Sequence, residues 1–469
     1  MSGVYDLVIV GGGSAGLEAA DFAAKLGARV ALVEKNRIGG DCTWTGCVPS
    51  KTLLKAAKVA HEMRHAQRYG LTAANQAVDL KSVMSHVRDV EAQIYQQESP
   101  DALRAKGIDV FLGDARFLGP RQLAVDDAIV RGRRFLLATG AHPFVPSIEG
   151  LDGVNYLTYD SVWDLDVLPQ RLLVVGAGPI GCELAQAFCR LGADVTIIEA
   201  GERISDEPEV AQVIGGVLMA EGISLCPDVM VERAWQDTGG IHLMAGGEEL
   251  SGDALLIAVG RRPNVDGLDL ERAGVAYSAA GIQVNAHLRT SQRHIYAAGD
   301  CTGGYQFTHY AAWQAAIAVR NALLPGSARG VAERVPWNTF TDPEVAHVGL
   351  TEAQARQQYG DKVLTFQQPM EKSDRAWTEG NTAGFIKLVY KRSGKLLGVT
   401  IVAAQAGEMI HEWIIALERG LKVGDLAGII HVYPTYSIAS MQASADIRVS
   451  QLLSGISGKI IRWLVRRGR

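Results

Sequence analysis

The sequence lacks long apolar runs, an excess of basic residues and a leader-like start, and each absence excludes a class of protein. No uninterrupted apolar stretch reaches about 18 residues, so no segment is expected to span a membrane. The start Met1–Asp6 has no basic segment and no apolar run, so no signal peptide is expected. The net charge of −5 argues against general nucleic-acid binding. We therefore expect a cytoplasmic protein without a nucleic-acid partner.

Cysteine is also scarce, because the 469 residues contain only six cysteines and none follows Cys301. Structural disulfides are not expected in a chain without an export signal. Cys182 and Cys189 lie seven residues apart in a predicted helix, where core packing is the simplest interpretation. Cys301 is interpreted as packing or, alternatively, as a third thiol. Cys42 and Cys47 are the main candidates for chemistry.

The residues that are present are typical of a soluble globular protein, with 48% hydrophobic and 21% charged residues. One ordinary core does not account for this length, so we expect three domains, or alternatively four. Glycine is abundant, with 52 residues, and much of it lies in motifs that need a close approach of the backbone.

The first such motif follows a predicted strand. Residues 5–10 read YDLVIV, a nearly continuous apolar run that favours a strand buried on both faces of a parallel sheet. Gly11, Gly13 and Gly16 come next, followed by a predicted helix over 17–26, a strand over 29–33 and Glu34. An acid about 20 residues after the glycines completes the dinucleotide-binding fingerprint. The alternative is a plain glycine-rich turn. In the fingerprint, the glycines admit a pyrophosphate to the helix N-terminus and Glu34 binds a ribose diol.

The same order recurs later in the chain. Residues 171–175 read RLLVV, and Gly176, Gly178 and Gly181 follow. A predicted helix over 182–191 leads to a strand over 195–198 and to Glu199. Two dinucleotide sites in one chain predict an oxidoreductase that uses FAD and a nicotinamide cofactor.

Glu199 also bears on which nicotinamide is used. Its carboxylate would accept a hydrogen bond from a ribose 2′-OH and would repel a 2′-phosphate. A phosphate-specific site needs basic residues just beyond, but Ala200, Gly201 and Glu202 follow and only Arg203 is close. The sequence therefore favours NADH over NADPH.

The cysteine pair lies in residues 39–51, which read GGDCTWTGCVPSK. A regular helix would not align Cys42 with Cys47, but a distorted turn eased by Gly46 could bring the two sulfurs within bonding distance. A helix N-terminus there would lower a thiol pKa, which suits a redox pair, and Pro49 is harmless early in that helix. The alternatives are a structural disulfide and half of a zinc site. No second Cys/His pair has the spacing to complete a zinc site, so we predict no bound metal.

These motifs together resemble a known family. The pattern G-G-x-C-x-x-x-G-C-x-P-S-K is similar to the redox motif of the class I pyridine nucleotide–disulfide oxidoreductases, which include glutathione reductase, dihydrolipoamide dehydrogenase and mercuric reductase. Four further segments follow in the family's order. Residues 138–140 resemble the end of the first FAD segment, and residues 260–264 resemble the A-x-G-R-x-P-N segment. Residues 295–300 resemble the second FAD fingerprint, and residues 342–352 resemble the start of the dimerisation domain. The mercuric reductase-like branch is the most similar.

The resemblance implies a relay of electrons from NAD(P)H through flavin to the Cys42–Cys47 disulfide and on to a thiol-reactive acceptor. By position, Cys47 resembles the thiolate beside the flavin, and Cys42 resembles the thiol that attacks the acceptor. Lys51 matches a lysine near the flavin, and Glu183 occupies the place of its glutamate partner. Pro179 stands where some relatives carry a tyrosine that gates the nicotinamide pocket.

The predicted cofactor-binding residues form a larger set. They are Gly11, Gly13, Ser14, Ala15, Gly16, Glu34, Lys35, Gly40, Asp41, Thr139, Gly140, Gly176, Gly178, Pro179, Ile180, Gly181, Glu199, Gly260, Arg261, Gly299 and Asp300. The resemblance assigns Asp300 to the ribityl chain of the flavin.

The family pattern breaks near the C-terminus. Disulfide-reducing relatives carry a His-Pro there with a Glu five residues after the His, and this His, supplied by the partner subunit, protonates the leaving thiolate. In residues 430–440, IHVYPTYSIAS, alignment on Pro434 places Tyr433 at the histidine position and Ile438 at the glutamate position. His431 is the alternative, and on a strand it would share a face with Tyr433. Tyrosine, with an ordinary pKa of about 10, is a poor acid at neutral pH.

The acceptor is therefore left open between a soft metal ion, a small disulfide and another electrophile. Mercuric reductases have a tyrosine in this region, but the C-terminal cysteine pair and N-terminal domain that deliver their metal have no counterpart here. One rival function is dihydrolipoamide dehydrogenase or glutathione reductase activity. A second is a membrane-associated NADH-dependent quinone-reducing or electron-transfer flavoprotein, and a third is a redox-sensing interaction protein.

The last fifteen residues read GISGKIIRWLVRRGR. At helical spacing, one face collects Ile456, Ile460, Trp463 and Leu464, and the opposite side collects Lys459, Arg462 and Arg466. A basic amphipathic helix with a Trp suits the inner face of an anionic membrane. The alternative is a terminal helix packed on the protein's own dimer interface.

The predicted fold class is α/β, with two Rossmann-like dinucleotide-binding domains and a C-terminal α+β dimerisation domain. The FAD-binding domain is expected over 1–150 and 270–332, and the NAD(P)-binding domain over 151–269. The dimerisation domain is expected over 333–454, followed by the basic tail 455–469. The expected assembly is a homodimer in which the partner subunit completes the active site.

Overall fold

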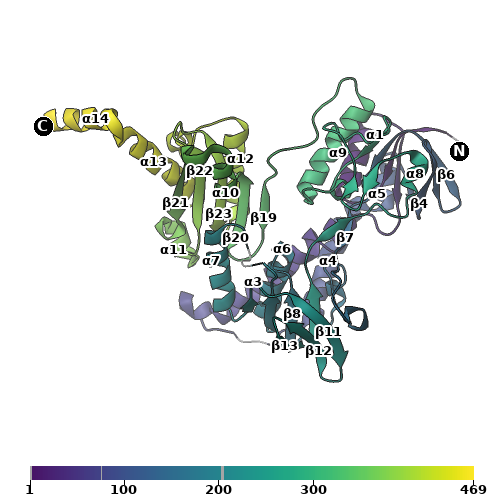
Figure 1. Ribbon diagram of the computed structural model, residues 1–469, viewed down its shortest axis with the longest axis horizontal. Coiled ribbons are helices and arrows are strands. Elements are labelled where there is room, and N and C mark those ends of the chain that lie inside the picture. The colour runs from purple at the N-terminus through teal and green to yellow at the C-terminus, as the bar shows by residue number, and fades with distance from the viewer. Residues whose placement is uncertain (1–2, 75–76, 202–204, 469) are drawn as a thin grey trace. The chain divides into compact units, whose positions relative to one another are not determined.

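The computed structural model describes residues 3–74, 77–201 and 205–468, which form two compact units (Figure 1). The first unit comprises Met1–Glu202 and Glu221–Glu333. The second comprises Arg203–Ala220 and Arg334–Arg469. Both units combine sheets with helices, so the α/β fold class is confirmed.

The largest sheet of the first unit has seven strands, in the order β3-β2-β1-β6-β5-β4, with β18 beside β6. Their bounds are β1 (Tyr5–Val10), β2 (Val30–Glu34), β3 (Ile108–Leu112), β4 (Ala115–Gly119), β5 (Gln122–Val125), β6 (Ala128–Leu137) and β18 (Ile295–Ala297). Strand β1 pairs in parallel with β2 and β6, and its alternate residues face two different cores. The strand predicted over 5–10 is thus confirmed.

Different elements cover the two faces of this sheet. Helices α1 (Ser14–Lys25) and α9 (Thr308–Leu323) pack their alanines on one face. The hairpin β4–β5 and the short helix α8 (Leu270–Ala273) close the other face. Because β18 and α9 follow the second glycine motif in sequence, the chain returns to its first sheet after building the second.

Four helices lie between β2 and β3, namely α2 (Gly40–Trp44), α3 (Cys47–Arg64), α4 (Leu80–Glu98) and α5 (Pro100–Ala105). The starts of α4 and α5 are stabilised by side chains that accept backbone N–H bonds, Asp79 from Lys81 and Ser99 from Ala102. Helix α3 packs against α4 and also against α6 (Pro179–Leu191). This packing brings the segment of the cysteine pair next to the second glycine motif.

The second parallel sheet has the order β10-β9-β8-β14, with bounds β8 (Arg171–Val175), β9 (Asp194–Ile198), β10 (Ser224–Cys226) and β14 (Ala254–Ile257). Helix α6 packs against β8 and β9. An antiparallel sheet covers the other side, formed by β11 (Val231–Asp237), β12 (Gly240–Ala245) and β13 (Glu248–Gly252). Two small pairs complete the unit, β7 (Ala141–Pro143) with β15 (Arg261–Pro263) and β16 (Tyr277–Ser278) with β17 (Gly281–Ile282).

The second unit is built on an antiparallel sheet in the order β19-β20-β23-β22-β21. Its strands are β19 (Trp337–Thr339), β20 (Glu344–Gly349), β21 (Val363–Pro369), β22 (Phe385–Lys391) and β23 (Leu396–Ala403). Its helices are α7 (Pro208–Ala220), α10 (Glu352–Tyr359), α11 (Asp374–Glu379), α12 (Ala406–Glu418), α13 (Ile438–Leu453) and α14 (Gly455–Arg467). Helices α12 and α13 share one core with the sheet, where the fully buried Trp413 donates to the Ser440 hydroxyl at 3.0 Å.

Helix α7 groups with the second unit, although its sequence lies inside the range predicted for NAD(P) binding. The reason is a buried charge cluster around Lys387, whose ammonium lies 2.9 Å from Glu209, 3.0 Å from Glu352 and 3.5 Å from Glu207. Thr400 also donates a hydrogen bond to Glu207. The other predicted domain boundaries stay predictions.

Two expectations about the C-terminal part have clear outcomes. The segment around His431 and Tyr433 is a loop, so it does not have the strand geometry under which these two side chains would share a face. The helix expected in the tail is present as α14, which projects from the second unit beyond α13 (Figure 1). Across the described residues, no helix combines the length and apolarity needed to cross a membrane.

Candidate active site

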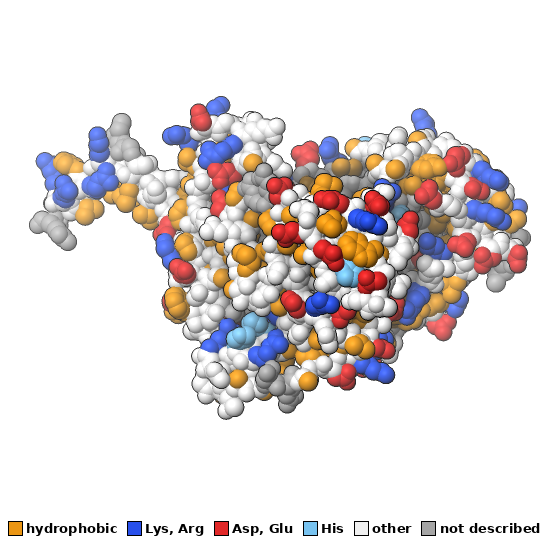
Figure 2. Space-filling view, turned by 60° about the horizontal axis from the view of Figure 1, so that its bottom comes forward, with side chains coloured by type: hydrophobic (Ala, Val, Ile, Leu, Met, Phe, Trp, Pro, Cys, Tyr) orange, Lys and Arg blue, Asp and Glu red, His pale blue; other side chains and the backbone are white. Residues whose placement is uncertain are grey.

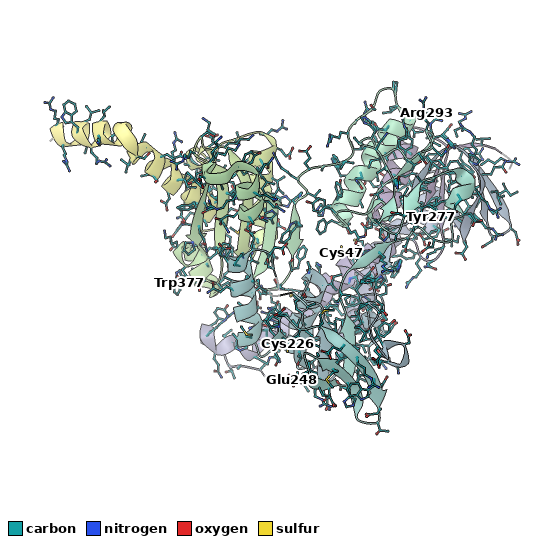
Figure 3. All side chains as sticks on the ribbon, viewed as in Figure 1. Cys47, Cys226, Glu248, Tyr277, Arg293 and Trp377 are labelled. Carbon is teal, nitrogen blue, oxygen red and sulfur yellow. The ribbon has the colours of Figure 1, made fainter. Side chains whose placement is uncertain are left out.

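The cysteine pair lies at a break between two helices. Cys42 is in the middle of α2, and Cys47 is the first residue of α3, as Figure 3 shows for Cys47. Gly46 stands between the helices, and a Cβ on it would lie only 2.8 Å from the Asp41 carbonyl oxygen. The distorted turn expected at Gly46 is therefore present, and it requires glycine for steric reasons.

The thiols of Cys42 and Cys47 have opposite tendencies to ionise. A hydrogen bond from the Cys42 thiol is the main cause that lowers the pKa of Cys47, against an opposing effect of burial, to about 6. The same hydrogen bond, together with burial, raises the pKa of Cys42 well above its usual range. The pair thus holds its proton on Cys42 and its negative charge on Cys47.

Thr308 supports the charge on Cys47 from a distant part of the sequence. Its hydroxyl oxygen lies 3.3 Å from the Cys47 sulfur and lowers the pKa of that thiol. Thr308 is the first residue of α9, which has no side-chain cap, so the helix presents unpaired backbone N–H groups there. A hydroxyl donor and a helix N-terminus therefore meet the thiolate from the same side.

Lys51 and Glu183 form the predicted ion pair. The Lys51 ammonium donates to the Glu183 carboxylate at 2.9 Å, which joins α3 to α6. The Glu183 side chain is buried, and Lys51 lowers the pKa of Cys47 through its charge. The pair thus links the second glycine motif electrostatically to the cysteine site.

The first glycine turn has room for a dinucleotide phosphate. Gly11 has φ +108°, and a Cβ there would lie 2.2 Å from the Ala138 carbonyl oxygen. A Cβ on Gly13 would meet nothing closer than a Gly40 backbone carbon at 3.6 Å, so space remains in front of the helix that Gly13 begins without a side-chain cap. The Glu34 carboxylate accepts from the Gly12 N–H at 2.7 Å, which places it beside this turn. These features fit the pyrophosphate and ribose of FAD.

The second turn repeats this geometry. Gly176 has φ +105°, and a Cβ on Gly181 would lie 2.0 Å from the Gly176 carbonyl oxygen. Among the described residues outside its own helix and chain neighbours, no atom lies within 4 Å of the position that a Cβ on Gly178 would take. The Glu199 carboxylate accepts from the Ala177 N–H at 2.6 Å and from the Gly201 N–H at 2.7 Å. The residues therefore fit a second dinucleotide, and Pro179 and Ile180 occupy the first turn of α6 behind it.

Arg261 joins three segments of the predicted flavin site. Its guanidinium donates to Asp300 at 2.6 Å, to Asp41, and to the Tyr159 hydroxyl at 2.9 Å. Burial raises the pKa of Asp300 while the Arg261 charge opposes that rise. This network fixes the position of α2, which carries Cys42, against the second FAD fingerprint.

Thr139 and Asn264 make a reciprocal pair beside this network. The Thr139 hydroxyl donates to the Asn264 carbonyl at 2.7 Å, and the Asn264 amide donates to the Thr139 carbonyl at 2.8 Å. The end of β6 is thereby fastened to the segment after Gly260. Two motifs separated by 125 residues thus become one wall of the site.

The remaining predicted cofactor residues occupy the same surroundings. Ser14 opens α1 and hydrogen-bonds with Cys42, and Ala15 is buried in the next position. A Cβ on Gly40 would lie 2.6 Å from a Gly13 backbone carbon, and Gly299 donates its N–H to Gln314. A Cβ on Gly16 would collide with the Gly11 carbonyl oxygen, and Gly140 has φ +69°. Lys35 is exposed and directly follows Glu34.

His431 and Tyr433 belong to the second unit and bind separate partners. The Tyr433 hydroxyl donates to Asp374 at 2.6 Å, and this hydrogen bond raises its pKa. His431 has the Glu412 carboxylate 2.8 Å from Nε2 and the Ile429 carbonyl 3.0 Å from Nδ1. Burial alone would lower the pKa of His431, but these two bonds outweigh it and the pKa is raised.

The partners of His431 determine its protonation. A carboxylate and a carbonyl oxygen only accept hydrogen bonds, so these two contacts favour the protonated ring, in agreement with the raised pKa of His431. Both protons are then engaged with Glu412 and Ile429. Neither His431 nor Tyr433 is therefore arranged as a free acid for a leaving thiolate.

The other thiols have the features of packed side chains. Cys301 is fully buried, donates to the Leu137 and Ala298 carbonyls, and has its pKa raised by burial to about 11. Burial raises the pKa of Cys182 to about 12. Among the described residues, no group of three or more His, Cys, Asp or Glu is placed to hold a metal ion.

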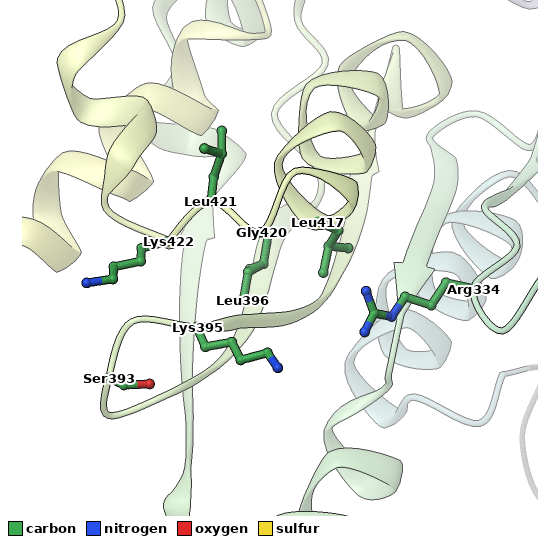
Figure 4. A pocket seen from close by; sticks show the side chains of 8 residues that line it. All are labelled: Arg334, Ser393, Lys395, Leu396, Leu417, Gly420, Leu421 and Lys422. Carbon is green, nitrogen blue, oxygen red and sulfur yellow. The ribbon is translucent and has the colours of Figure 1, made fainter.

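A pocket of about 440 Å³ lies in the second unit (Figure 4). Arg334, Lys395 and Lys422 line it over an apolar floor, and its described lining contains no carboxylate. None of the predicted site residues lines it. This pocket is therefore separate from the candidate chemistry.

Several residues that shape the site were not identified from the sequence. Thr308, Tyr159 and Gln314 act through contacts with residues far away in the chain. Glu412 and Asp374 likewise act through contacts with residues that are distant in the chain. No local pattern marks any of these residues, since their roles depend on the tertiary fold.

A family model described as pyridine nucleotide-disulphide oxidoreductase matches residues 5–315. The dimerisation domain of the same family matches residues 335–443. A mercuric reductase of Staphylococcus aureus is 37% identical over 447 residues, which cover 92% of this chain and 80% of that protein. A dihydrolipoyl dehydrogenase of Thermus scotoductus is 37% identical over 458 residues, which cover 94% and 96% of the two chains.

A solved structure is similar as well. The HOCl-induced flavoprotein disulfide reductase RclA from Escherichia coli has a TM-score of 0.86 and 29% identity, covering 94% of this chain and 99% of that one. A Cu(II) complex of the same reductase has a TM-score of 0.84, again with 29% identity, covering 93% and 98% of the two chains. The similarity thus extends over both units of the chain.

Proposed function

Since this chain belongs to the pyridine nucleotide-disulphide oxidoreductase family, we propose that its Cys42–Cys47 pair passes electrons from NADH to a thiophilic metal ion. Enzymes of this family depend on FAD and use NAD(P)H, so the oxidoreductase expected from the motifs is confirmed. The dimerisation domain supports a homodimer. The relatives do not favour the quinone-reducing alternative.

The chemistry that bound FAD supplies is the transfer of two electrons from the nicotinamide to the cysteine pair. Gly11, Gly13 and Glu34 would hold its dinucleotide part, and Arg261 with Asp300 would face its ribityl chain. Lys51, paired with Glu183, would lie near the flavin. The fit rests on the open glycine turn and the Arg261 network described above.

The reduced pair has a defined distribution of charge. Two electrons break the Cys42–Cys47 bond, one proton stays on the Cys42 thiol, and Cys47 remains a thiolate because its pKa is about 6. Thr308 and Lys51 stabilise that thiolate. Cys42 is then the sulfur that meets the acceptor.

The observation that carries the choice of acceptor is the state of His431 and Tyr433. If the acceptor were a disulfide, attack by Cys42 would release a thiolate that needs a proton. Both ring nitrogens of His431 are already engaged, with Glu412 and with the Ile429 carbonyl, and the hydrogen bond to Asp374 makes Tyr433 a weaker acid. A metal ion has no leaving group to protonate, so it avoids this requirement.

Reduction of a metal ion balances without a general acid. The Cys42 thiol loses its proton to water, and its sulfur binds the ion beside Cys47. The Cys42–Cys47 bond re-forms, and the electron pair passes to one ion in a two-electron step or to two ions in one-electron steps. We infer that the hydroxyl oxygen of Tyr433 of the partner subunit contacts the bound ion. His431 has a structural role, because its contact with Glu412 holds the loop around His431 against α12.

NADH is the proposed electron donor because of Glu199. Its carboxylate is held by two backbone N–H groups at the end of β9, where a 2′-phosphate would meet a like charge. Arg203, the closest basic residue in sequence, lies outside the described residues. A cytoplasmic location is part of the proposal, because a reducing compartment suits the reduced buried thiols Cys182 and Cys301.

The proposal is tested with the holoenzyme in an acceptor screen under anaerobic conditions. NADH oxidation is followed with mercuric or cupric ions and, separately, with lipoamide and glutathione disulfide. We expect turnover with a metal ion, its loss in Cys42→Ser, and little turnover with either disulfide. Rapid disulfide reduction that His431→Gln abolishes would show that His431 is the acid and that the metal proposal is wrong.

A further inference from the structure

The end of the second unit carries apolar side chains that its own chain leaves uncovered. In α14, Ile460, Trp463 and Leu464 are 51%, 49% and 56% exposed. Three side chains at the end of α13 are exposed too, namely Val449, Leu452 and Leu453. The side chain of Ile456, predicted on the same face, lies outside the described residues. The two helices thus present an unpartnered apolar face.

The two groups repeat the same spacing. Val449, Leu452 and Leu453 stand at positions i, i+3 and i+4, and Ile460, Trp463 and Leu464 repeat this pattern eleven residues later. Such positions share one face of a helix. The two groups belong to separate helices, because α13 ends at Leu453, Ser454 is extended and α14 begins at Gly455; each group therefore forms an apolar face of its own helix. A cation precedes each group, Arg448 the first and Lys459 the second.

The charge of this end has a single sign. Residues 447–469 contain six basic side chains and no acidic one, namely Arg448, Lys459, Arg462, Arg466, Arg467 and Arg469. Figure 2 shows Lys and Arg side chains beside hydrophobic ones on the projecting α14. The Arg467 guanidinium lies 4.1 Å from the centre of the Trp463 ring. On α14, whose residues include no acidic side chain, an apolar face beside cations is complementary to an anionic apolar layer.

Arg462 forms a hydrogen bond across the connection between α13 and α14. Its guanidinium donates to the Leu453 carbonyl at 3.2 Å, at the point where α13 ends. A cation there stabilises the helix C-terminus and holds the start of α14 near it. We assign Lys459 and Arg466 to an external anion, because Arg467 lies over the Trp463 ring.

We propose that α14 and the end of α13 bind an anionic lipid surface, with the two apolar groups in the acyl boundary and Lys459 and Arg466 at the lipid phosphates. A second copy of the same helix fits less well, because face-to-face packing would bring cations against cations. A homodimer carries two such ends, and engaging both on one membrane strengthens the attachment without new contacts. This surface is independent of the acceptor proposed above.

The test is co-sedimentation of the holoenzyme with vesicles. We expect binding to vesicles of equal parts phosphatidylcholine and phosphatidylglycerol, weakening with added salt, and little binding to pure phosphatidylcholine. Each basic residue at such a surface changes binding by about fivefold, so Lys459→Gln with Arg466→Gln should lower the partition coefficient by about 25-fold. NADH oxidation should be unchanged in this double variant.

Matched variants distinguish this proposal from non-specific hydrophobic binding to vesicles. Ile460→Glu should abolish vesicle binding, whereas Ile129→Glu, at an equally exposed isoleucine of β6, should not. A chain that ends at Leu453 should remain dimeric in sedimentation velocity and should not bind. Equal binding by the two isoleucine variants, salt-insensitive binding, or dissociation of the shortened dimer would each overturn the proposal.

Discussion

Thr308→Val should raise the pKa of Cys47, because the substitution removes a hydroxyl and changes the side-chain volume little. That hydroxyl lies 3.3 Å from the sulfur and is one of the groups that lower the pKa of Cys47 to about 6. Valine keeps a β-branched side chain at the first position of α9. The substitution therefore isolates the hydroxyl from the helix N-terminus behind it.

The size of the effect follows from the strength of the bond. A hydrogen bond to a charged group contributes about 1.5–3 kcal/mol, and one pKa unit corresponds to about 1.36 kcal/mol. Taking the lower end for a sulfur acceptor, we expect a rise of about one unit, to about 7. At pH 7 the thiolate share of Cys47 then falls from about nine tenths to about half.

The assay is a pH titration of the holoenzyme in a Cys42→Ser background. That change prevents the disulfide and leaves Cys47 to titrate alone, while the serine hydroxyl still donates a hydrogen bond. The thiolate beside oxidised flavin is followed by its long-wavelength absorbance. Thr308→Ser is the matched control, because it retains the hydroxyl and should keep the midpoint of the parent.

Two outcomes would refute the reasoning. An unchanged midpoint in Thr308→Val would mean that the hydroxyl does not support the thiolate. An equal rise in Thr308→Ser would mean that packing at the start of α9, rather than hydrogen bonding, controls the pKa of Cys47.

Three further predictions concern other parts of the chain. Glu199→Ser should shift the ratio of kcat/KM for NADPH over NADH upward by about tenfold, since one like charge is removed; an unchanged ratio would place selectivity elsewhere. Lys387→Met should destabilise the second unit by about 3–5 kcal/mol, because it leaves buried carboxylates without their cation, and an unaltered thermal midpoint would contradict this. His431→Gln should lower Tm most below pH ~6.5, because protonated His431 stabilises the folded state when its pKa is raised there. The difference in Tm should vanish as the pH rises through the pKa of His431 in the folded state. A difference that grows with pH would show that the Glu412 pair is not ionic.

The strands and glycine turns were predictable because their causes are local. The apolar run before Gly11 buries all its side chains only as a strand that is covered on both faces. Glycine is required at position 11 because a Cβ there would collide with the Ala138 carbonyl oxygen. The turn at Gly46 follows from the same kind of contact. In each case the reason lies within the motif or directly against it.

The acceptor side was less predictable because its causes are distant. Tyr433 bonds Asp374 from 59 positions away, and His431 bonds Glu412 from 19 positions away. The spacing of His431 and Tyr433 would place them on one face only in a strand, whereas this segment is a loop in which each side chain binds its own partner. Thr308 meets Cys47 across 261 positions, which no spacing rule anticipates.

The placement of α7 has a consequence for the order in which the chain is synthesised. Glu209 leaves the ribosome 178 residues before Lys387, its partner in the second unit. At about 5–20 residues per second this delay is roughly ten to thirty-five seconds. During that interval the segment around α7 can form its helix but not its final contacts. The two dinucleotide motifs, which end at Glu34 and Glu199, are complete in the nascent chain long before helix α7, which follows them, makes its final contacts.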